Sequence, residues 1–162
     1  MRILGEAVDV TGSYGETYTN YDNKFQIDTG TSNPYILGSS GEGLMGELDG
    51  ENVVQDGTNI RLKIASGGEG IYEVHLSAAA ETSGGPQTPE FTVKIAVNGT
   101  PDCKISNVTD YNGSAVYGSG TAVSGLYELE ANDIVALAIQ TLDPWQFYVM
   151  NYHLWIRRIA RK

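Results

Sequence analysis

Hydrophobic and polar residues alternate at every second position in several segments of the chain, as expected for half-buried β-strands. Within Gly70–Ala80 and Phe91–Val97 one face is consistently apolar, formed by Tyr72, Val74, Leu76 and Ala78 in the first segment and by Phe91, Val93, Ile95 and Val97 in the second. Asn59–Ala65 shows the same period in the first half of the chain. The dipeptide Asn98-Gly99 directly follows the second of these runs, and this pair is the commonest hairpin turn because both residues tolerate positive φ. The pattern therefore predicts strands joined by tight turns.

Shorter apolar runs predict further strands, and no segment has the period of a helix of normal length. The chain contains 20 glycines, which suit frequent turns between these runs. Turns at this spacing favour an all-β jelly-roll sandwich of about eight to ten antiparallel strands. The further strands are expected at Glu6–Val10, Phe25–Ile27, Tyr35–Leu37, Cys103–Val108, Thr121–Leu129, Asp133–Leu142 and Phe147–Ile159.

The length of 162 residues suits one domain with a core of its own. Residues 1–23 are polar, with tyrosines spaced among Gly, Thr and Asn, so they are expected to form an arm or an edge strand that could dock on a partner. Residues 24–162 are expected to form the jelly-roll domain and its basic C-terminal end.

The last predicted strand is apolar on both faces, although a sandwich needs only one apolar face. Simple alternation assigns Tyr148, Met150, Tyr152, Leu154 and Ile156 to one face. A second apolar face left in water usually marks an interface. We therefore expect a neighbouring subunit to cover it; the alternative is a long loop of the same chain. This second face, the predicted trimer interface, comprises Phe147, Val149, Asn151, His153 and Trp155.

The net charge of −10 disfavours a nucleic-acid-binding role, because an acidic surface repels phosphate backbones. A single cysteine, Cys103, excludes an intrachain disulfide. The N-terminal residues lack the apolar run of a signal peptide, and no segment reaches the length needed to span a bilayer, so we expect synthesis in a cytoplasm and no membrane partner.

Basic residues concentrate at the C-terminus, against the acidic balance of the chain. They could dock on an acidic neighbour, and the alternative is a solvated tail. Together with the N-terminal tyrosines they are the predicted docking residues: Tyr14, Tyr18, Tyr21, Arg157, Arg158, Arg161 and Lys162.

Residues for catalysis are not apparent in the sequence. His75 and His153 lie within predicted strands, and Cys103 has no motif that would supply a base. The acidic turn Glu47–Asn52 lacks the alternating spacing of an EF-hand, so a solvated turn is the favoured interpretation. We therefore expect a non-enzymatic protein without a cofactor or a bound metal.

The second half of the chain resembles the globular domain of the C1q/tumour-necrosis-factor superfamily, a trimeric jelly roll. Gly70-Ile71-Tyr72-Glu73-Val74 looks like the family's G-x-Y-x-(apolar) strand, and Val93–Gly99 looks like the next strand with its Asn-Gly turn. Leu126–Leu137 looks like the strand, corner and strand that follow, with Asn132 where the family usually has glycine. The chain then ends on an apolar strand, as the family does.

The resemblance implies a homotrimer. Short chains of this type look like the C1q-like modules that occur on bacteriophage particles. The expected function is therefore a virion structural protein, of the capsid-decoration or head-fibre type, that docks on a capsid protein or another virion protein. The alternative is a tail-fibre tip that binds a receptor or a host-surface glycan, with Tyr111 and Tyr117 as the ligand surface. A glycan hydrolase is the third hypothesis, and it would need two facing carboxylates, to which no motif points.

Overall fold

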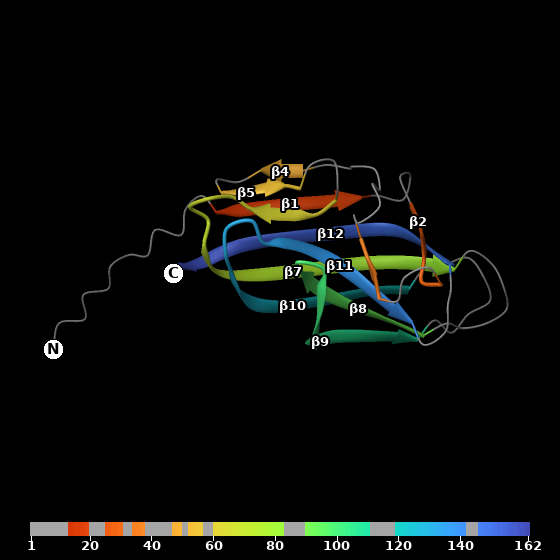
Figure 1. Cartoon of the computed structure of the whole chain (residues 1–162). Coiled ribbons are helices and arrows are strands. Elements are labelled where there is room, and N and C mark those ends of the chain that lie inside the picture. The colour runs from red at the N-terminus through yellow and green to blue at the C-terminus, as the bar shows by residue number, and fades with distance from the viewer. Residues whose placement is uncertain are drawn as a thin grey trace.

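The chain folds into two antiparallel β-sheets packed face to face, as seen in a computed structural model (Figure 1). The structure describes residues 13–19, 25–30, 34–37, 47–49, 52–56, 60–82, 90–110, 119–141 and 146–162. These residues contain twelve strands and no helix, which confirms the predicted all-β class. Nothing among them could cross a bilayer as a helix.

The first sheet is built around the longest strand, β12 (Gln146–Arg161). Its strand order is β10-β7-β12-β1-β4, and β2 also pairs with β12. Every pairing in this sheet is antiparallel. The other strands of this sheet are β1 (Tyr14–Thr19), β2 (Phe25–Asp28), β4 (Glu47–Asp49), β7 (Gly70–Thr82) and β10 (Ser119–Leu129).

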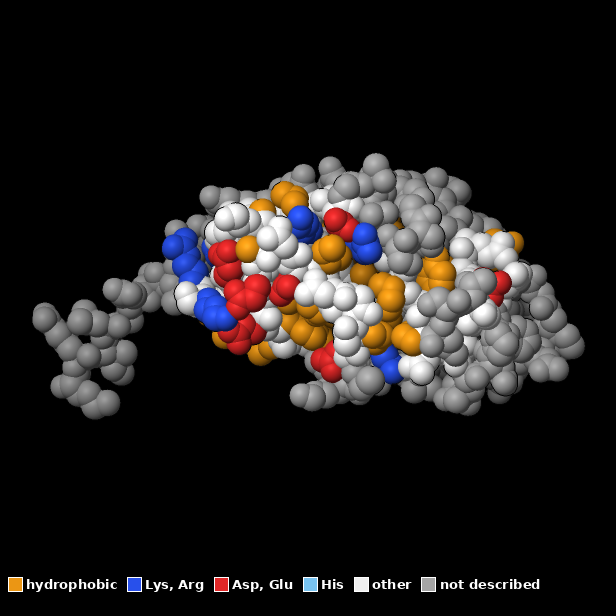
Figure 2. Space-filling view, in the orientation of Figure 1, with side chains coloured by type: hydrophobic (Ala, Val, Ile, Leu, Met, Phe, Trp, Pro, Cys, Tyr) orange, Lys and Arg blue, Asp and Glu red, His pale blue; other side chains and the backbone are white. Residues whose placement is uncertain are grey.

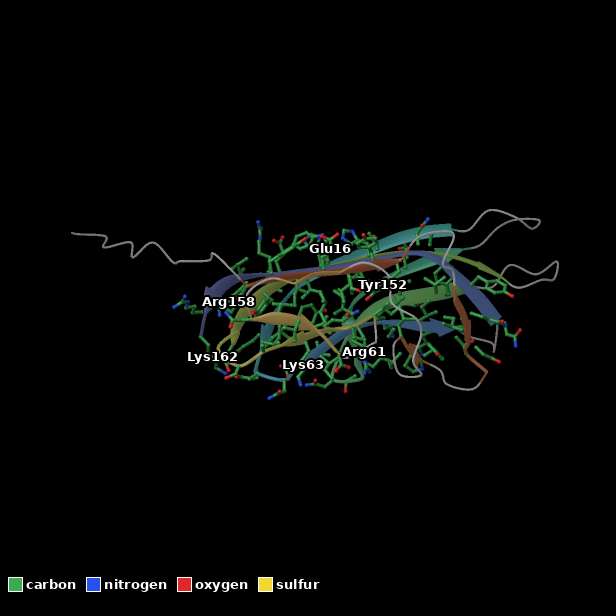
Figure 3. All side chains as sticks on the ribbon, turned by 90° about the horizontal axis from the view of Figure 1, so that it is seen from above. Glu16, Arg61, Lys63, Tyr152, Arg158 and Lys162 are labelled. Atoms are coloured by element: carbon green, nitrogen blue, oxygen red, sulfur yellow. The ribbon has the colours of Figure 1, made fainter. Side chains whose placement is uncertain are left out.

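The second sheet has β11 (Ile134–Thr141) at its centre. Its order is β5-β6-β11-β8-β9, and β3 also pairs with β11. Figure 3 shows the two layers from above, with Glu16 on the outer side of the first sheet and Arg61 and Lys63 on the second. The other strands of this sheet are β3 (Tyr35–Ile36), β5 (Val53–Gln55), β6 (Leu62–Ile64), β8 (Glu90–Val97) and β9 (Thr100–Asp110).

The core lies between the sheets and follows from the two-residue alternation of the long strands. Tyr72, Val74, Leu76 and Ala78 of β7 all point inward and are buried. Tyr152 of β12 is also buried, and its hydroxyl donates a 3.1 Å hydrogen bond to the Ile60 carbonyl. The first sheet thus uses one face for the core and presents its other face outward.

Two turns have the backbone conformation that the sequence predicts. Asn98 and Gly99 have φ values of 51° and 76°, and they close the β8–β9 hairpin. Asn132 has a φ of 73° at the β10–β11 corner, which confirms asparagine as the substitute for glycine there. The Asn98 side chain joins the two turns, since its Nδ2 donates to Asp133 and its Oδ1 accepts from the Ile134 amide.

The N-terminal strand and a bulge in β12 differ from the prediction. β1 lies between β12 and β4, so these six residues are an inner strand of the sheet and part of the jelly roll, and neither an arm nor an edge. In β12 the register with β7 shifts between Val149 and Asn151. A bulge adds one residue to one strand and reverses the alternation beyond it. Val149 therefore points into the core on the same side as Tyr152.

Candidate interaction surface

The outward face of the first sheet carries the side chains that the core does not use. We call this surface the outer face. Cross-strand register sorts its residues into rows that run across β10, β7, β12 and β1. The rows are Leu126–Glu73–Arg157–Tyr14, Ser124–His75–Trp155–Glu16, Ala122–Ser77–His153–Tyr18 and Gly120–Ala79–Asn151.

Larger side chains stand on the β12 and β1 half of the outer face. Glu16, Tyr18, His153 and Trp155 form what we call the ridge. Glu16 Oε1 lies 2.8 Å from His153 Nε2, and the Tyr14 hydroxyl donates to the same carboxylate. Partial burial, and then the bond to Glu16, raise the pKa of Tyr14 to about 12. The carboxylate of Glu16 therefore holds both neighbouring side chains in place.

A stacked pair of rings joins the ridge to β7. The His75 and Trp155 rings lie 4.0 Å apart between centroids, with 9° between their planes. Beside them Glu73 accepts a 2.7 Å hydrogen bond from Arg157 and lies 3.0 Å from His75. Hydrogen bonds from His75 and then from Arg157 lower the pKa of Glu73. Both histidines of the chain thus lie on this face, each beside a carboxylate.

Small side chains cover part of the β7 and β10 half of the outer face, and the surface is hollowed there. We call this part the hollow; it consists of Ser77, Ala79, Gly120, Ala122 and Ser124. One cavity of about 530 Å³ is bounded by Glu16, Tyr18 and His153 of the ridge and floored by Ala79 and Gly120. A second, of about 220 Å³, lies next to the His75–Trp155 stack over Ala122 and Ser124. The ridge is one wall of this depression.

Apolar side chains are exposed at the end of the outer face nearest the C-terminus. Leu126 is 63% exposed, Ile71 40% and Ile159 37%, although all three are large hydrophobic residues. Lys162 pairs with Glu128 at 2.9 Å and also with Glu130. Figure 2 shows acidic and basic side chains gathered at this end of the molecule. These paired charges border the apolar end of the face.

Asn151, His153 and Trp155 of the predicted interface lie on the outer face. Assigning Val149 to this interface is wrong, because the bulge turns its side chain into the core, where it is fully buried. The backbone of Phe147 pairs with β2 and β7, and its side chain lies outside the described residues. The role of the three outward residues in a trimer stays a prediction.

The predicted basic docking tip is largely used within the chain. Arg158 is buried, and its Nη1 donates a 3.0 Å hydrogen bond to the Gly67 carbonyl, so its assignment to a docking surface is wrong (Figure 3). Arg157 and Lys162 form the ion pairs described above. Arg161 is exposed at the end of β12. A free four-residue basic tail therefore does not exist.

Among the predicted tyrosines, Tyr18 is 43% exposed on the ridge and Tyr14 is half-buried beside it. Tyr21, Tyr111 and Tyr117 lie outside the described residues. The docking and ligand-binding predictions for these three positions therefore stay predictions.

Several residues of the outer face were not predicted from the sequence. Leu126 and Ile71 lie in strands whose core face is clearly apolar, and a strand pattern alone does not tell which outward residue is covered by a partner. The available signal was the run of small residues at every second position of β10, Gly120, Ala122 and Ser124. Within the described part of the chain, acidic, histidine and cysteine side chains form no cluster of three or more that could hold a metal.

Comparison with known structures identifies the type of fold. No family profile and no curated protein matches the sequence. The structure of Eiger TNF from S. frugiperda matches with a TM-score of 0.60 at 8% identity, over 94% of this chain and 95% of that chain. The crystal structure of rabbit GITRL matches with a TM-score of 0.46 at 21% identity, over 69% of this chain and 81% of that chain. The chain thus has a tumour-necrosis-factor-like jelly-roll fold.

Proposed function

We propose that this protein is a non-enzymatic assembly module that forms a homotrimer through the outer face of its first sheet. One observation carries the proposal: three of the five exposed large hydrophobic residues in the described part of the chain lie on the outer face, next to an open depression. Leu126, Ile71 and Tyr18 are the most exposed of them. Burying apolar surface stabilises by about 25 cal/mol per Å², so covering this face drives association.

The charges on the outer face are compatible with contact between copies there. Three copies of a chain with net charge −10 repel one another unless they meet where charge is balanced. On the outer face, Glu73 is paired with Arg157, and Glu16 contacts His153. The contact thus adds little repulsion of its own.

The proposed setting is a virus particle, where the trimer would dock on a capsid protein or another virion protein. Support for this step comes from the resemblance of the sequence to C1q-like modules of bacteriophages. Assembly of the trimer precedes docking, so the two are tested in that order.

Light scattering of the purified chain tests the assembly. A mass near three times 17.4 kDa is expected, and a monomer at micromolar concentration would contradict the proposal. Mixing the trimer with purified particles lacking it, followed by sedimentation, then tests docking. Selective binding on a glycan array, without binding to particles, would instead favour the receptor-binding tip.

A further inference from the structure

We infer that Asn98 is a site of slow self-modification, at which the side-chain amide is lost through attack by the backbone nitrogen of Gly99. The hydrogen bonds that hold the Asn98 side chain in the folded protein govern this reaction. While these bonds are closed they prevent the reaction, and once it has occurred they cannot form again. The inference does not rest on the proposed trimer, because Asn98 lies in the β8–β9 turn of the second sheet.

The chemistry needs only the two residues of the turn and water. Asparagine is thermally labile, and a following glycine favours the reaction because it has no Cβ to hinder the approach of its backbone nitrogen. The Gly99 nitrogen forms a bond to Asn98 Cγ, and the bond from Cγ to Nδ2 breaks. Ammonia leaves with the proton of the Gly99 amide, and a succinimide ring remains. Water opens this ring to aspartate or isoaspartate, so the net change is hydrolysis of one amide.

The turn presents this pair of residues to solvent. Asn98 and Gly99 are both exposed, with φ values of 51° and 76°. A Cβ added at Gly99 would meet no atom within 4 Å, so the turn is open on that side. Contact between copies through the outer face of the first sheet leaves this turn accessible as well. Water and base can therefore reach the peptide group between the two residues.

Two hydrogen bonds, which we call the clasp, restrain the Asn98 side chain. Its Nδ2 donates to Asp133 Oδ1 at 2.7 Å, and its Oδ1 accepts from the Ile134 amide at 2.9 Å. The other oxygen of Asp133 accepts from the Glu130 amide at 2.8 Å, so the acceptor in the clasp is itself fixed. Asn98 Cγ must turn toward the Gly99 nitrogen before the ring can close, and this rotation breaks the clasp. The reaction therefore proceeds only from molecules in which the clasp has opened.

The product of the reaction prevents the clasp from closing again. An aspartate at position 98 places a carboxylate oxygen against Asp133 Oδ1, where the amide nitrogen donated at 2.7 Å. Like charges at this separation repel, and no donor is left between them. Isoaspartate adds an atom to the main chain, which a hairpin turn of two residues does not accommodate. Because Asp133 and Asn132 also form backbone hydrogen bonds with Ile64 at the end of β6, the change loosens this end of the second sheet irreversibly.

Mass spectrometry of tryptic peptides measures the reaction during incubation at mildly alkaline pH, because each deamidation raises the peptide mass by one dalton. Asn98 is expected to react more slowly in the folded chain than in urea. Asp133→Ala removes an acceptor from the clasp and should raise the rate in the folded chain about tenfold, the factor that one hydrogen bond to a charged group represents. Asp133→Asn keeps an acceptor oxygen and is the matched control, with a rate near that of the natural chain. Asn112-Gly113, the other Asn-Gly pair, lies outside the described residues and is the internal reference, whose rate should not respond to either variant.

A second pair of variants tests the consequence of the reaction without waiting for it. Asn98→Asp reproduces the product with a normal main chain and should lower the urea concentration at the midpoint of unfolding. Asn98→Asp combined with Asp133→Asn should recover most of this loss, because the new amide donates to the new carboxylate. Circular dichroism shows whether Asp133→Ala is folded; if it is not, this second pair decides.

Three results would overturn the inference. The first is an equal rate for Asn98 in the folded and unfolded natural chain, and the second is an unchanged rate in folded Asp133→Ala. The third is full stability of Asn98→Asp, since the clasp would then tolerate the product. The mass of the natural chain in solution, whether that of a trimer or a monomer, bears on the proposed function alone.

Discussion

Asn132 adopts a left-handed backbone conformation, with φ at 73°, where the chain turns from β10 into β11. Residues with a Cβ other than asparagine and aspartate adopt it at a cost of about 1–2 kcal/mol. Asn132→Ala should therefore lower the free energy of unfolding by about 1 kcal/mol, whereas Asn132→Gly should keep or raise it. Urea denaturation of the two variants measures this difference. Equal stability of both would show that the turn does not depend on this conformation.

Tyr152 has its ring and hydroxyl inside the core, and burial raises its pKa. A tyrosine with a raised pKa stabilises the fold fully below the pKa of the unfolded chain, near 10. This contribution disappears as the pH rises above that value, because the unfolded state ionises first. Tyr152→Phe should cost about 1 kcal/mol at pH 7 through the lost bond to Ile60.

The same variant should lose less stability than the natural chain between pH 10 and pH 11. Denaturant unfolding at pH 7, 9, 10 and 11 measures both changes. Parallel stability curves for the two proteins would mean that ionisation of Tyr152 does not contribute to alkaline unfolding.

Gly15 allows β1 to lie close to the second sheet. A Cβ at this position would be 2.3 Å from Cγ1 of Val53 and 3.5 Å from Leu62 Cδ2. Gly15→Ala should therefore destabilise the protein by about 1–3 kcal/mol through overpacking. Val53→Ala alone should cost about 2 kcal/mol, since it empties a fully buried site.

The double variant Gly15→Ala/Val53→Ala should cost less than the two single variants together, because the new methyl group occupies the space that Val53 vacates. A thermodynamic cycle from urea unfolding gives this coupling. Additive effects would show that β1 moves away from Val53 instead of packing against it.

Elements with strict alternation were predicted correctly, and those whose position depends on tertiary contacts were not. β7 and most of β8 bury every second residue, so their pattern alone reveals them, whereas β11 is buried at five consecutive positions and was predicted from its apolar run. β4 and β5 have three residues each, too few for a period to be visible. The polar sequence of β1 conceals a strand whose inward positions are Gly15 and Thr17, which fit only because the opposite sheet lies so close.

The predicted interface also shows that alternation alone does not reveal features that depend on tertiary contacts. Alternation assigned His153 and Trp155 to the outer face correctly, since no irregularity separates them from the centre of β12. It failed for Val149 because a bulge leaves no mark in the pattern of a strand that is apolar on both faces. The hollow was also missed, because it depends on small residues of β7 and β10 that become neighbours only when the strands pair.

A substitution at the exposed Leu126 of the edge strand β10 can disrupt assembly without disturbing the fold of the single chain. Leu126 is 63% exposed in the single chain, so a charge there should leave the monomer's core intact. In the proposed trimer the same side chain is covered, and an unpaired buried carboxylate is strongly unfavourable. Leu126→Asp should therefore convert the trimer into a monomer, as measured by light scattering. The melting temperature of the natural trimer should rise with protein concentration, whereas that of the Leu126→Asp variant should not depend on it.

Val54→Asp is the matched control, because Val54 is also an exposed hydrophobic strand residue but lies on the second sheet. This variant should remain a trimer. If both variants stay trimeric, the outer face is not the contact surface. If both become monomeric, the added negative charge on a chain that already carries −10 suffices to separate the copies, and the contact is weak everywhere. Only dissociation confined to Leu126→Asp assigns the trimer contact to the first sheet.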